Sequence, residues 1–219
     1  MNLKILLFST GVYPVFPPGY SGLEQLVGDL AWCLGKSGHD VYVLAPEGSD
    51  GQGVFKIITP VKPGFHNDEN GMYQAIKPAL KDFDIIHQHN WGGLAYDYKR
   101  EHPEARVLST MHGPATFTSK PPGVDKPCLV AASHAHKNWL DAQFDLGEIK
   151  VVNHGIDLAK YSVSQSSKLD YLLFLARISD EKGALEFVRF CRRHKHKGIL
   201  AGTDQGTASG LGYIRQVMQ

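Results

Sequence analysis

Short apolar runs alternate with helix-like segments through most of this chain. The runs are continuous, as in strands buried on both faces, whereas the segments between them place apolar residues at helical spacing. Strands are expected at residues 3–8, 41–44, 54–59, 84–87, 106–111, 128–132 and 149–152. Helices are expected at residues 23–37, 71–82, 91–100 and 133–144. This alternation predicts an α/β fold with a mostly parallel, Rossmann-like sheet and helices on both faces.

A polar, serine-rich segment at residues 162–168 interrupts the alternation. Its composition is typical of a linker, so we place the first domain at residues 1–164 and the second at 165–219. The second domain has two expected strands, an expected helix and a helical tail pattern, at residues 170–176, 198–201, 183–194 and 211–218. A two-stranded sheet is marginal by itself. This incomplete Rossmann-like unit is therefore expected to pack against the first domain or a partner.

The overall composition is that of an ordinary globular protein. Hydrophobic residues make up 42% of the chain, and the formal net charge is +1. The sequence has no basic stripe that would indicate binding to nucleic acid, and no polybasic tail that would indicate binding to an anionic membrane. No apolar run approaches the roughly 18 residues that span a bilayer, and the first residues lack a signal-peptide cleavage site. These features predict a cytoplasmic protein without an integral membrane segment.

The cysteines Cys33, Cys128 and Cys191 lie far apart and form no C-x-x-C pair. Cys33 falls within a helical pattern and Cys128 begins a strand pattern. We therefore expect both to be buried thiols of a reducing compartment, without a catalytic role.

A proline- and glycine-rich loop leads into the first expected helix. Ser21 and Glu24 are three residues apart, as a capping box requires. Glu24 can therefore have a structural role at the start of the helix. Gly22 lies at the helix start, where only glycine allows close backbone approach to a phosphate or sugar. The structural alternative is that glycine suits the backbone geometry of the helix start.

The expected strand at 170–176 is followed by two cations, Arg177 and Lys182, the second at the start of a helix. Fixed cations and the free N–H groups of a helix N-terminus stabilise a diphosphate. The alternative is a pair of solvated charges at a surface turn, with Asp180 and Glu181 as their partners.

Several histidines lie near strand ends. His112 follows the strand at 106–111, at the carboxyl edge where open α/β sheets bind ligands. His87 and His89 form an H-x-H pair, but no spacing supplies the further ligands that zinc needs, so no metal site is predicted. His154 precedes an expected tight turn, and its contact with a ligand is an open alternative to a purely structural role.

Seven segments, in order, resemble the retaining glycosyltransferases of family 4. They are residues 17–46, DIIHQHNW at 84–91, STMHG at 109–113, LVAASHAHKNWL at 129–140, VVNHGIDLAKY at 151–161, FLARISDEKGALEFV at 174–188 and ILAGTD at 199–204. That family has the GT-B architecture, in which two Rossmann-like domains face a cleft. The resemblance implies that the first domain binds the acceptor and the second binds the sugar donor.

The resemblance also implies a reaction and a set of site residues. A hexosyltransferase of this type moves a sugar from a nucleotide-diphosphate sugar to an acceptor hydroxyl with retention, by a front-face route. It uses no metal and no cofactor besides the donor. Catalytic roles are implied for His112, Arg177 and Lys182. Substrate or nucleotide-sugar contacts are implied for Gly22, Glu24, His154 and Gly202.

The chain also departs from the family pattern. Ser21 stands where the family has the first glycine of a pair, Asn153 and His154 replace Pro and Asn, and Ala176 replaces a common glycine. The E-x7-E motif of the family would lie beyond the last residue. The alternative is therefore a non-catalytic module that binds a nucleotide or glycan, or a half-enzyme completed by a homodimer or a complementary subunit. A Rossmann dehydrogenase is disfavoured because no G-x-G-x-x-G follows the first strand.

Overall fold

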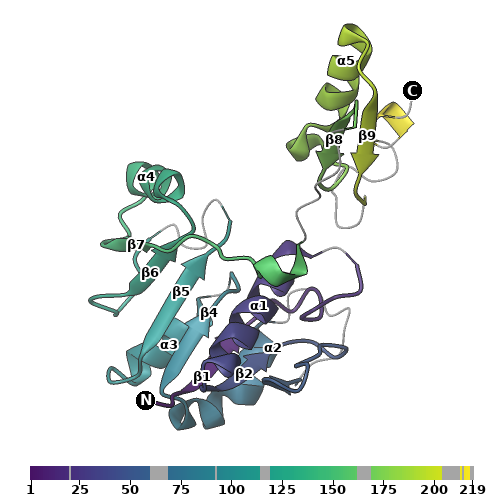
Figure 1. The fold of residues 1–219 in the computed structure, drawn as a ribbon. Helices are drawn as coiled ribbons and strands as arrows, with labels where there is room; N and C mark the ends of the chain where they lie inside the picture. The colour runs from purple at the N-terminus through teal and green to yellow at the C-terminus, as the bar shows by residue number, and fades with distance from the viewer. Residues whose placement is uncertain are drawn as a thin grey trace. The chain divides into compact units, whose positions relative to one another are not determined.

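The computed structural model describes residues 1–19, 21–59, 69–91, 93–113, 119–161, 169–203, 213 and 215–217. By its internal contacts the chain divides into two compact units, Met1–Lys160 and Tyr161–Gln219 (Figure 1). The predicted linker at 162–168 lies outside the described residues.

The first unit is built on one seven-stranded sheet. Its strands are β1 Lys4–Phe8, β2 Asp40–Leu44, β3 Lys56–Ile58, β4 Ile85–Gln88, β5 Val107–Met111, β6 Cys128–Ala131 and β7 Ile149–Val151. Every neighbouring pair is parallel, and the order is β3-β2-β1-β4-β5-β6-β7. The predicted α/β fold with a parallel sheet is confirmed. Because the strand order reverses between β1 and β4, the carboxyl ends of these strands border the crevice where such sheets bind ligands.

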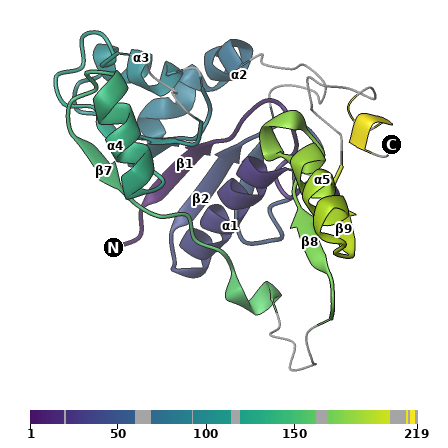
Figure 2. The ribbon, with the colours of Figure 1, turned by 90° about the horizontal axis from the view of Figure 1, so that it is seen from above.

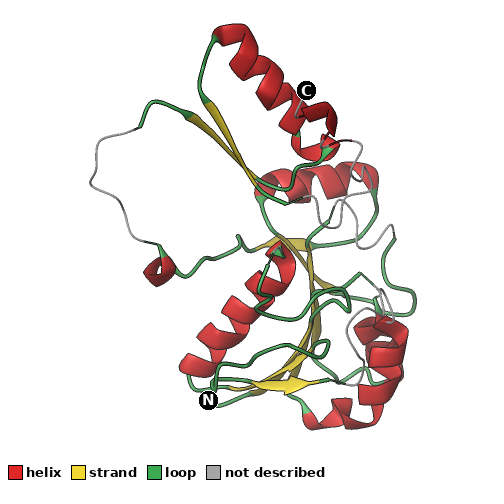
Figure 3. Cartoon of the chain, turned by 90° about the vertical axis from the view of Figure 1, so that its right-hand side faces the viewer, coloured by secondary structure: helices red, strands yellow, loops and turns green. Residues whose placement is uncertain are grey.

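Strand β1 shows why its sequence is a continuous apolar run. Leu6 and Phe8 belong to the core on one face of the sheet, and Ile5 and Leu7 belong to the core on the other. Successive side chains of a strand point to opposite faces, so a strand with helices on both sides needs apolar residues at every position. Figure 3 shows helices flanking the strands on both sides.

Among the described residues of this unit, four α-helices cover the sheet. They are α1 Gly22–Lys36, α2 Glu69–Ile76, α3 Leu94–Glu101 and α4 His134–Gln143. Helix α1 lies beside β1 and β2 (Figure 2). Its Val27 and Ala31 pack in the core with residues of both strands. Residues of α2, α3 and α4 belong to the core on the opposite face.

Two helices differ from their predicted bounds by more than one residue. The helix expected at 71–82 changes at Ile76 into a 3₁₀-helix, Lys77–Asp82, because Pro78 lacks the N–H group that an α-helix needs. The helix expected at 91–100 begins only at Leu94, after Gly93 in the left-handed conformation with φ of 65°. Apolar spacing alone does not show where a backbone reverses its handedness.

The second unit is small. Strands β8 Leu172–Leu175 and β9 Gly198–Ala201 are parallel, and the 3₁₀-helix Asp180–Lys182 and helix α5 Ala184–His194 connect them. Its described core consists of Ala184, Tyr213 and Val217, with partly buried apolar neighbours. Leu175 of β8 remains 76% exposed. The expected tail positions 211, 214 and 218 lie outside the described residues.

Candidate functional site

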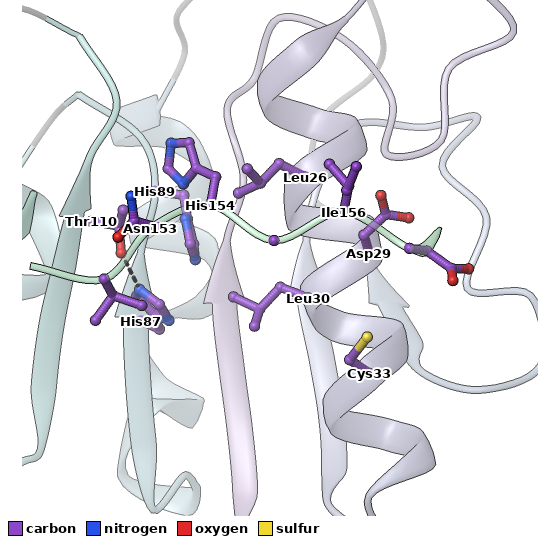
Figure 4. A pocket seen from close by; sticks show the side chains of 13 residues that line it. Leu26, Asp29, Leu30, Cys33, His87, His89, Thr110, Asn153, His154 and Ile156 are labelled. Carbon is purple, nitrogen blue, oxygen red and sulfur yellow. Dashed lines mark hydrogen bonds between the residues drawn. The ribbon is translucent and has the colours of Figure 1, made fainter. Parts of the chain in front are cut away.

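The first unit contains a cavity of about 230 Å³ beside α1 (Figure 4). Three parts of the chain line it: α1, the carboxyl ends of β4 and β5, and the segment that follows β7. The lining residues are Leu26, Asp29, Leu30, Cys33, His87, His89, Thr110 and residues 152–157. The cavity thus lies at the sheet edge where the strand order predicts a ligand.

One face of helix α1 lines the cavity. Val27 and Ala31 point into the core with β1 and β2. A neighbouring stripe, at the helical spacing i, i+3, i+4 and i+7, lines the cavity and consists of Leu26, Asp29, Leu30 and Cys33. The helix therefore has a core face and a cavity face side by side.

This second face corrects the expectation for Cys33. Its thiol is exposed at the cavity, so the prediction of a buried cysteine is wrong at this position. The helical pattern indicated one apolar face, but the cysteine lies on the other. Cys128 is half-buried and Cys191 is buried.

Four histidine rings meet at this edge of the sheet. The ring centroids of His87 and His89 are 4.0 Å apart, those of His89 and His112 are 5.1 Å apart, and those of His112 and His154 are 5.0 Å apart. The structure thus brings two of the predicted site residues, His112 and His154, together with the H-x-H pair. We call His87, His89, His112 and His154 the histidine cluster.

Sequence reasoning considered His87 and His89 only as zinc ligands and missed this cluster. A signal for it was present, because His89 and His112 are each the first residue after a strand. Strands β4 and β5 are neighbours, so residues at equivalent strand ends lie close together. The order of the strands was not known from the sequence, and the two positions could not be paired.

Hydrogen bonds fix the arrangement of the cluster. Nε2 of His87 lies 2.8 Å from Oγ1 of Thr110, and Nδ1 of His89 lies 2.9 Å from Nε2 of His112. Nε2 of His89 is buried and has no partner among the described residues. An unpaired N–H group is less well tolerated in an interior than an unpaired lone pair. The proton of His89 is therefore on Nδ1, and this N–H donates a hydrogen bond to Nε2 of His112. Because Nε2 of His112 is the acceptor, the proton of His112 is on its Nδ1.

Burial keeps these rings uncharged at neutral pH. It lowers the pKa of His87 to about 4 and, with smaller effects from neighbouring histidines, that of His112 to about 3. It also lowers the pKa of His89 well below its usual value, and burial together with His136 lowers that of His154. The cluster therefore offers hydrogen bonds without fixed positive charge. A group with the pKa of His112 is a weak proton acceptor at pH 7, so its N–H suits hydrogen bonding better than general-base chemistry.

Glu24 lies at the start of α1 and is 4% exposed. The hydroxyl of Ser21 accepts the N–H of Glu24 at 3.3 Å, which confirms the predicted cap at this residue. The carboxylate of Glu24 accepts hydrogen bonds from the hydroxyls of Ser21 and Thr10. Burial raises its pKa, although hydrogen bonds from the Thr10 hydroxyl and from the backbone of Glu24 and Tyr13 act against that rise. Glu24 thus ties the loop after β1 to the first turn of α1.

Replacing Glu24 with alanine is expected to lower the free energy of unfolding of the first unit by about 2–4 kcal/mol. The change leaves the hydroxyls of Thr10 and Ser21 without their acceptor in a buried setting, and each such loss costs about 1–3 kcal/mol. Chemical unfolding followed by tryptophan fluorescence measures it. Gln25→Ala, in the same turn, is the control, and equal stabilities of the two variants would refute the structural role.

Gly22, the other predicted residue at this helix start, is exposed. A Cβ atom there would meet no atom of the described residues within 4 Å. The fold therefore imposes no packing reason for glycine at this position, and its contact with a ligand stays a prediction.

The remaining predicted residues lie in the second unit, at the carboxyl ends of β8 and β9. Arg177 follows β8 and forms an ion pair with Glu181, one of the partners considered from the sequence. Lys182 is exposed at the end of the 3₁₀-helix, just before α5. Gly202 directly follows β9, and a Cβ atom there would lie 1.8 Å from the carbonyl oxygen of Ala176. Packing alone thus requires glycine at position 202, whether or not a ligand binds there.

Within the described part of the chain, no three His, Cys, Asp or Glu residues are grouped as metal ligands. Nor does any described helix have the length and apolar character needed to cross a membrane.

The parallel sheet and the order of its strands match the GT-B fold of glycosyltransferases. The sequence profile described as "Glycosyltransferase Family 4" matches residues 20–160, more than half of the chain. The chain belongs to glycosyltransferase family 4, as the seven resembling segments predicted. A search of curated proteins finds no match.

Solved structures agree with this assignment. The crystal structure of AviGT4, a glycosyltransferase involved in avilamycin A biosynthesis, is similar with a TM-score of 0.68 and 26% identity. The match covers 99% of this chain and 60% of AviGT4, so the chain spans 60% of the length of that relative.

Two more distant structures show the fold alone. An α-glucosyltransferase in complex with UDP and a 13-mer DNA containing an HMU base matches with a TM-score of 0.57 and 10% identity, over 98% of this chain and 60% of that one. An α-glucosyltransferase in complex with UDP-glucose and DNA containing an abasic site matches with a TM-score of 0.52 and 13% identity. This match covers 88% of this chain and 54% of that one.

Proposed function

We propose that this chain takes part in the transfer of a sugar from a nucleotide-diphosphate sugar to an acceptor hydroxyl, with retention of configuration at the anomeric carbon. The observation that carries the proposal is membership of glycosyltransferase family 4 over residues 20–160. In this proposal the first unit binds the acceptor and the second binds the donor, and no metal or further cofactor takes part.

The second unit supplies the groups that a diphosphate needs. Arg177 and Lys182 flank the turn between β8 and α5, and α5 presents its N-terminal N–H groups at the same turn. As the bond between the sugar and the phosphate breaks, negative charge grows on the leaving phosphate. Cations at this place stabilise the transition state more than the ground state. Arg177 would exchange its ion pair with Glu181 for the phosphate.

The first unit supplies neutral hydrogen-bonding groups. His112, with its proton on Nδ1, donates to an oxygen of the substrate, and His154 stacks against it at 5.0 Å. Gly22 and Glu24 lie at the start of α1, where Gly22 leaves the backbone accessible. In the front-face route, the acceptor oxygen bonds to the anomeric carbon as the sugar–phosphate bond breaks. The acceptor proton passes to the leaving phosphate, so no protein base is needed.

The proposal predicts that the chain binds nucleoside diphosphates and that Arg177→Ala and Lys182→Ala each weaken this binding about tenfold to a hundredfold. Hydrogen bonds to charged groups contribute about 1.5–3 kcal/mol each, which corresponds to that range. Calorimetric titration with UDP, ADP, GDP and TDP measures the affinity, and UDP comes first because two fold neighbours were determined with UDP or UDP-glucose.

Arg193→Ala is the matched control for this titration. It removes an exposed cation from the last turn of α5, at the opposite end from the diphosphate turn. Unchanged affinity in Arg177→Ala and Lys182→Ala would contradict the donor site. Binding without hydrolysis or transfer of a sugar nucleotide would favour the non-catalytic module, and light scattering would show whether a homodimer forms.

A further inference from the structure

The cavity beside α1 has apolar walls. Leu26 and Leu30 line it from the helix, and Val152 and Ile156 line it from the segment after β7. Figure 4 shows Leu26, Leu30 and Ile156 on the side of α1, and His87 and His89 on the side of the strands. Val152 and Ile156 are 60% and 64% exposed, although both are large apolar residues. Apolar side chains that surround a hollow and remain exposed are typical of a binding site for an apolar group.

The charges around the cavity argue against an anionic ligand. The histidine cluster is uncharged at neutral pH because burial lowers the pKa of its members. The charged residues among its described lining are Asp29 and Asp157, both acidic, and Asp29 is paired with Lys160 at 2.5 Å. Among the described residues of this lining, a diphosphate would meet no unpaired cation. The charges of the lining therefore argue against an anionic group, and the apolar walls favour an uncharged one.

The size of the cavity limits the group further. Its volume is about 230 Å³. An apolar cavity of about 150 Å³ is enough for a benzene ring. A ring or a short alkyl chain fits, but a whole sugar nucleotide does not.

We infer that this cavity holds the uncharged, apolar part of the acceptor, an aromatic ring or a short alkyl chain, and that Leu26 and Leu30 select for it. The assignment of this group to the acceptor rests on the proposed function. Thr110 and Asn153 lie on the cavity wall and can bond a hydroxyl or carbonyl of the same molecule. Acceptors with such a group are then preferred over wholly polar glycans.

The test uses 1-naphthylamine, a fluorophore with one fused ring system, which is neutral at pH 7 and changes its emission in apolar sites. The wild-type chain is expected to bind it with saturation, and Leu26→Asp is expected to weaken binding at least tenfold. Lys36→Asp is the matched control, because it places the same carboxylate on the exposed end of α1, outside the cavity. No saturable binding to the wild type, or equal binding to Leu26→Asp, would overturn the inference.

Leu26 is half-buried and lies outside the described core clusters, so Leu26→Asp is expected to fold. A second variant, Leu26→Trp, fills the cavity with an apolar side chain and is expected to block the fluorophore as well. Circular dichroism checks the fold of both. If Leu26→Asp does not fold, the result for Leu26→Trp tests the inference instead. Binding of the fluorophore to Leu26→Trp as tightly as to the wild type would refute the site.

Cys33 allows an independent check, because its thiol is exposed on the cavity face of α1. Alkylation with a bulky maleimide is expected to abolish fluorophore binding in the wild type but not in Cys33→Ser. That comparison excludes effects of Cys128 and Cys191. Undiminished binding after complete alkylation of Cys33 would count against the site.

A parallel titration with UDP separates this inference from the proposed function. If UDP binds but the fluorophore does not, the apolar cavity is refuted and the donor site stands. If the fluorophore binds in a manner sensitive to Leu26 but none of UDP, ADP, GDP and TDP binds, the apolar specificity stands and the proposed function is refuted.

Discussion

Replacing Gly202 with alanine is expected to lower the free energy of unfolding of the β8–α5–β9 unit by about 3 kcal/mol or more. The new Cβ atom would lie 1.8 Å from the carbonyl oxygen of Ala176, far inside contact distance. The backbone has no freedom to move away, since Ala176 donates to Ala201 at 3.2 Å and Ile178 donates to Thr203 at 2.9 Å. Relief of the clash must break these hydrogen bonds or separate the two strands.

Gly22→Ala is the matched control, because Gly22 is also a predicted substrate residue that follows a loop. In the part of the chain that the structure describes, no atom lies within 4 Å of a Cβ there, and the position is the first residue of α1. Alanine favours a helix over glycine by up to about 1 kcal/mol, so this variant is expected to be as stable as the wild type or slightly more so.

The two units can be followed separately in one sample. Trp32, Trp91 and Trp139 are the three tryptophans, and all lie in the first unit, so their fluorescence reports its unfolding. Hydrogen exchange of the β8 and β9 amides reports the second unit. Wild-type protection of β8 and β9 in Gly202→Ala would refute the packing argument. Loss of ligand binding in this variant would not by itself identify Gly202 as a ligand contact.

Acidification from pH 6.5 to pH 4 is expected to destabilise the first unit by a few kcal/mol. The pKa of His87 is about 4 and that of His112 about 3 in the folded chain, below the usual value of 6.5. Between pH 6.5 and the lower pKa values of the folded chain, the unfolded chain binds more protons than the folded chain. The stability that the neutral histidines contribute is therefore complete above pH 6.5 and decreases as the pH is lowered. Each pKa unit corresponds to about 1.4 kcal/mol for one group.

Glu24 changes the stability with pH in the opposite direction to the histidines. Its pKa is raised above the usual 4.5, so the stability it contributes is present below pH 4.5 and is lost as pH rises through the folded value. This single carboxyl opposes several histidines whose pKa values are lowered. The histidine cluster is therefore expected to set the sign of the overall dependence.

His87→Gln provides the test of this pH dependence. The variant cannot take up a proton at this position, so the loss of stability between pH 6.5 and pH 4 is expected to be smaller than in the wild type. His134→Gln, at an exposed position at the start of α4, is the control and should keep the full dependence. Urea unfolding at several pH values measures it. A wild-type stability that does not change over this range would contradict the buried, neutral cluster.

Much of the fold was accessible from the sequence because its causes are local. The continuous apolar run of β1 indicates burial on both faces, and the structure places Leu6 and Leu7 in opposite cores. Ser21 caps α1 through the N–H of Glu24, as the spacing of the two residues predicts. The family was accessible for a different reason, since its segments keep their order along the chain and the profile match at residues 20–160 confirms it.

Where the prediction was wrong, the cause was not local. The spacing of apolar residues on α1 predicted one buried face, but the segment after β7 creates a second, and Cys33 lies on it. The helix expected at 91–100 starts late because Gly93 adopts a left-handed conformation that no apolar pattern records.

The sequence by itself determined the elements, the caps and the family, because neighbouring residues and their spacing specify them. Only the tertiary structure decided which distant residues meet. The pairing of β4 with β5 joins His89 to His112 across 23 positions, and the approach of β8 to β9 sets Gly202 against Ala176. Such contacts depend on strand order and register, which the pattern of one strand does not contain. The cavity beside α1 exists for the same reason, since it is formed by three segments that are far apart in the chain.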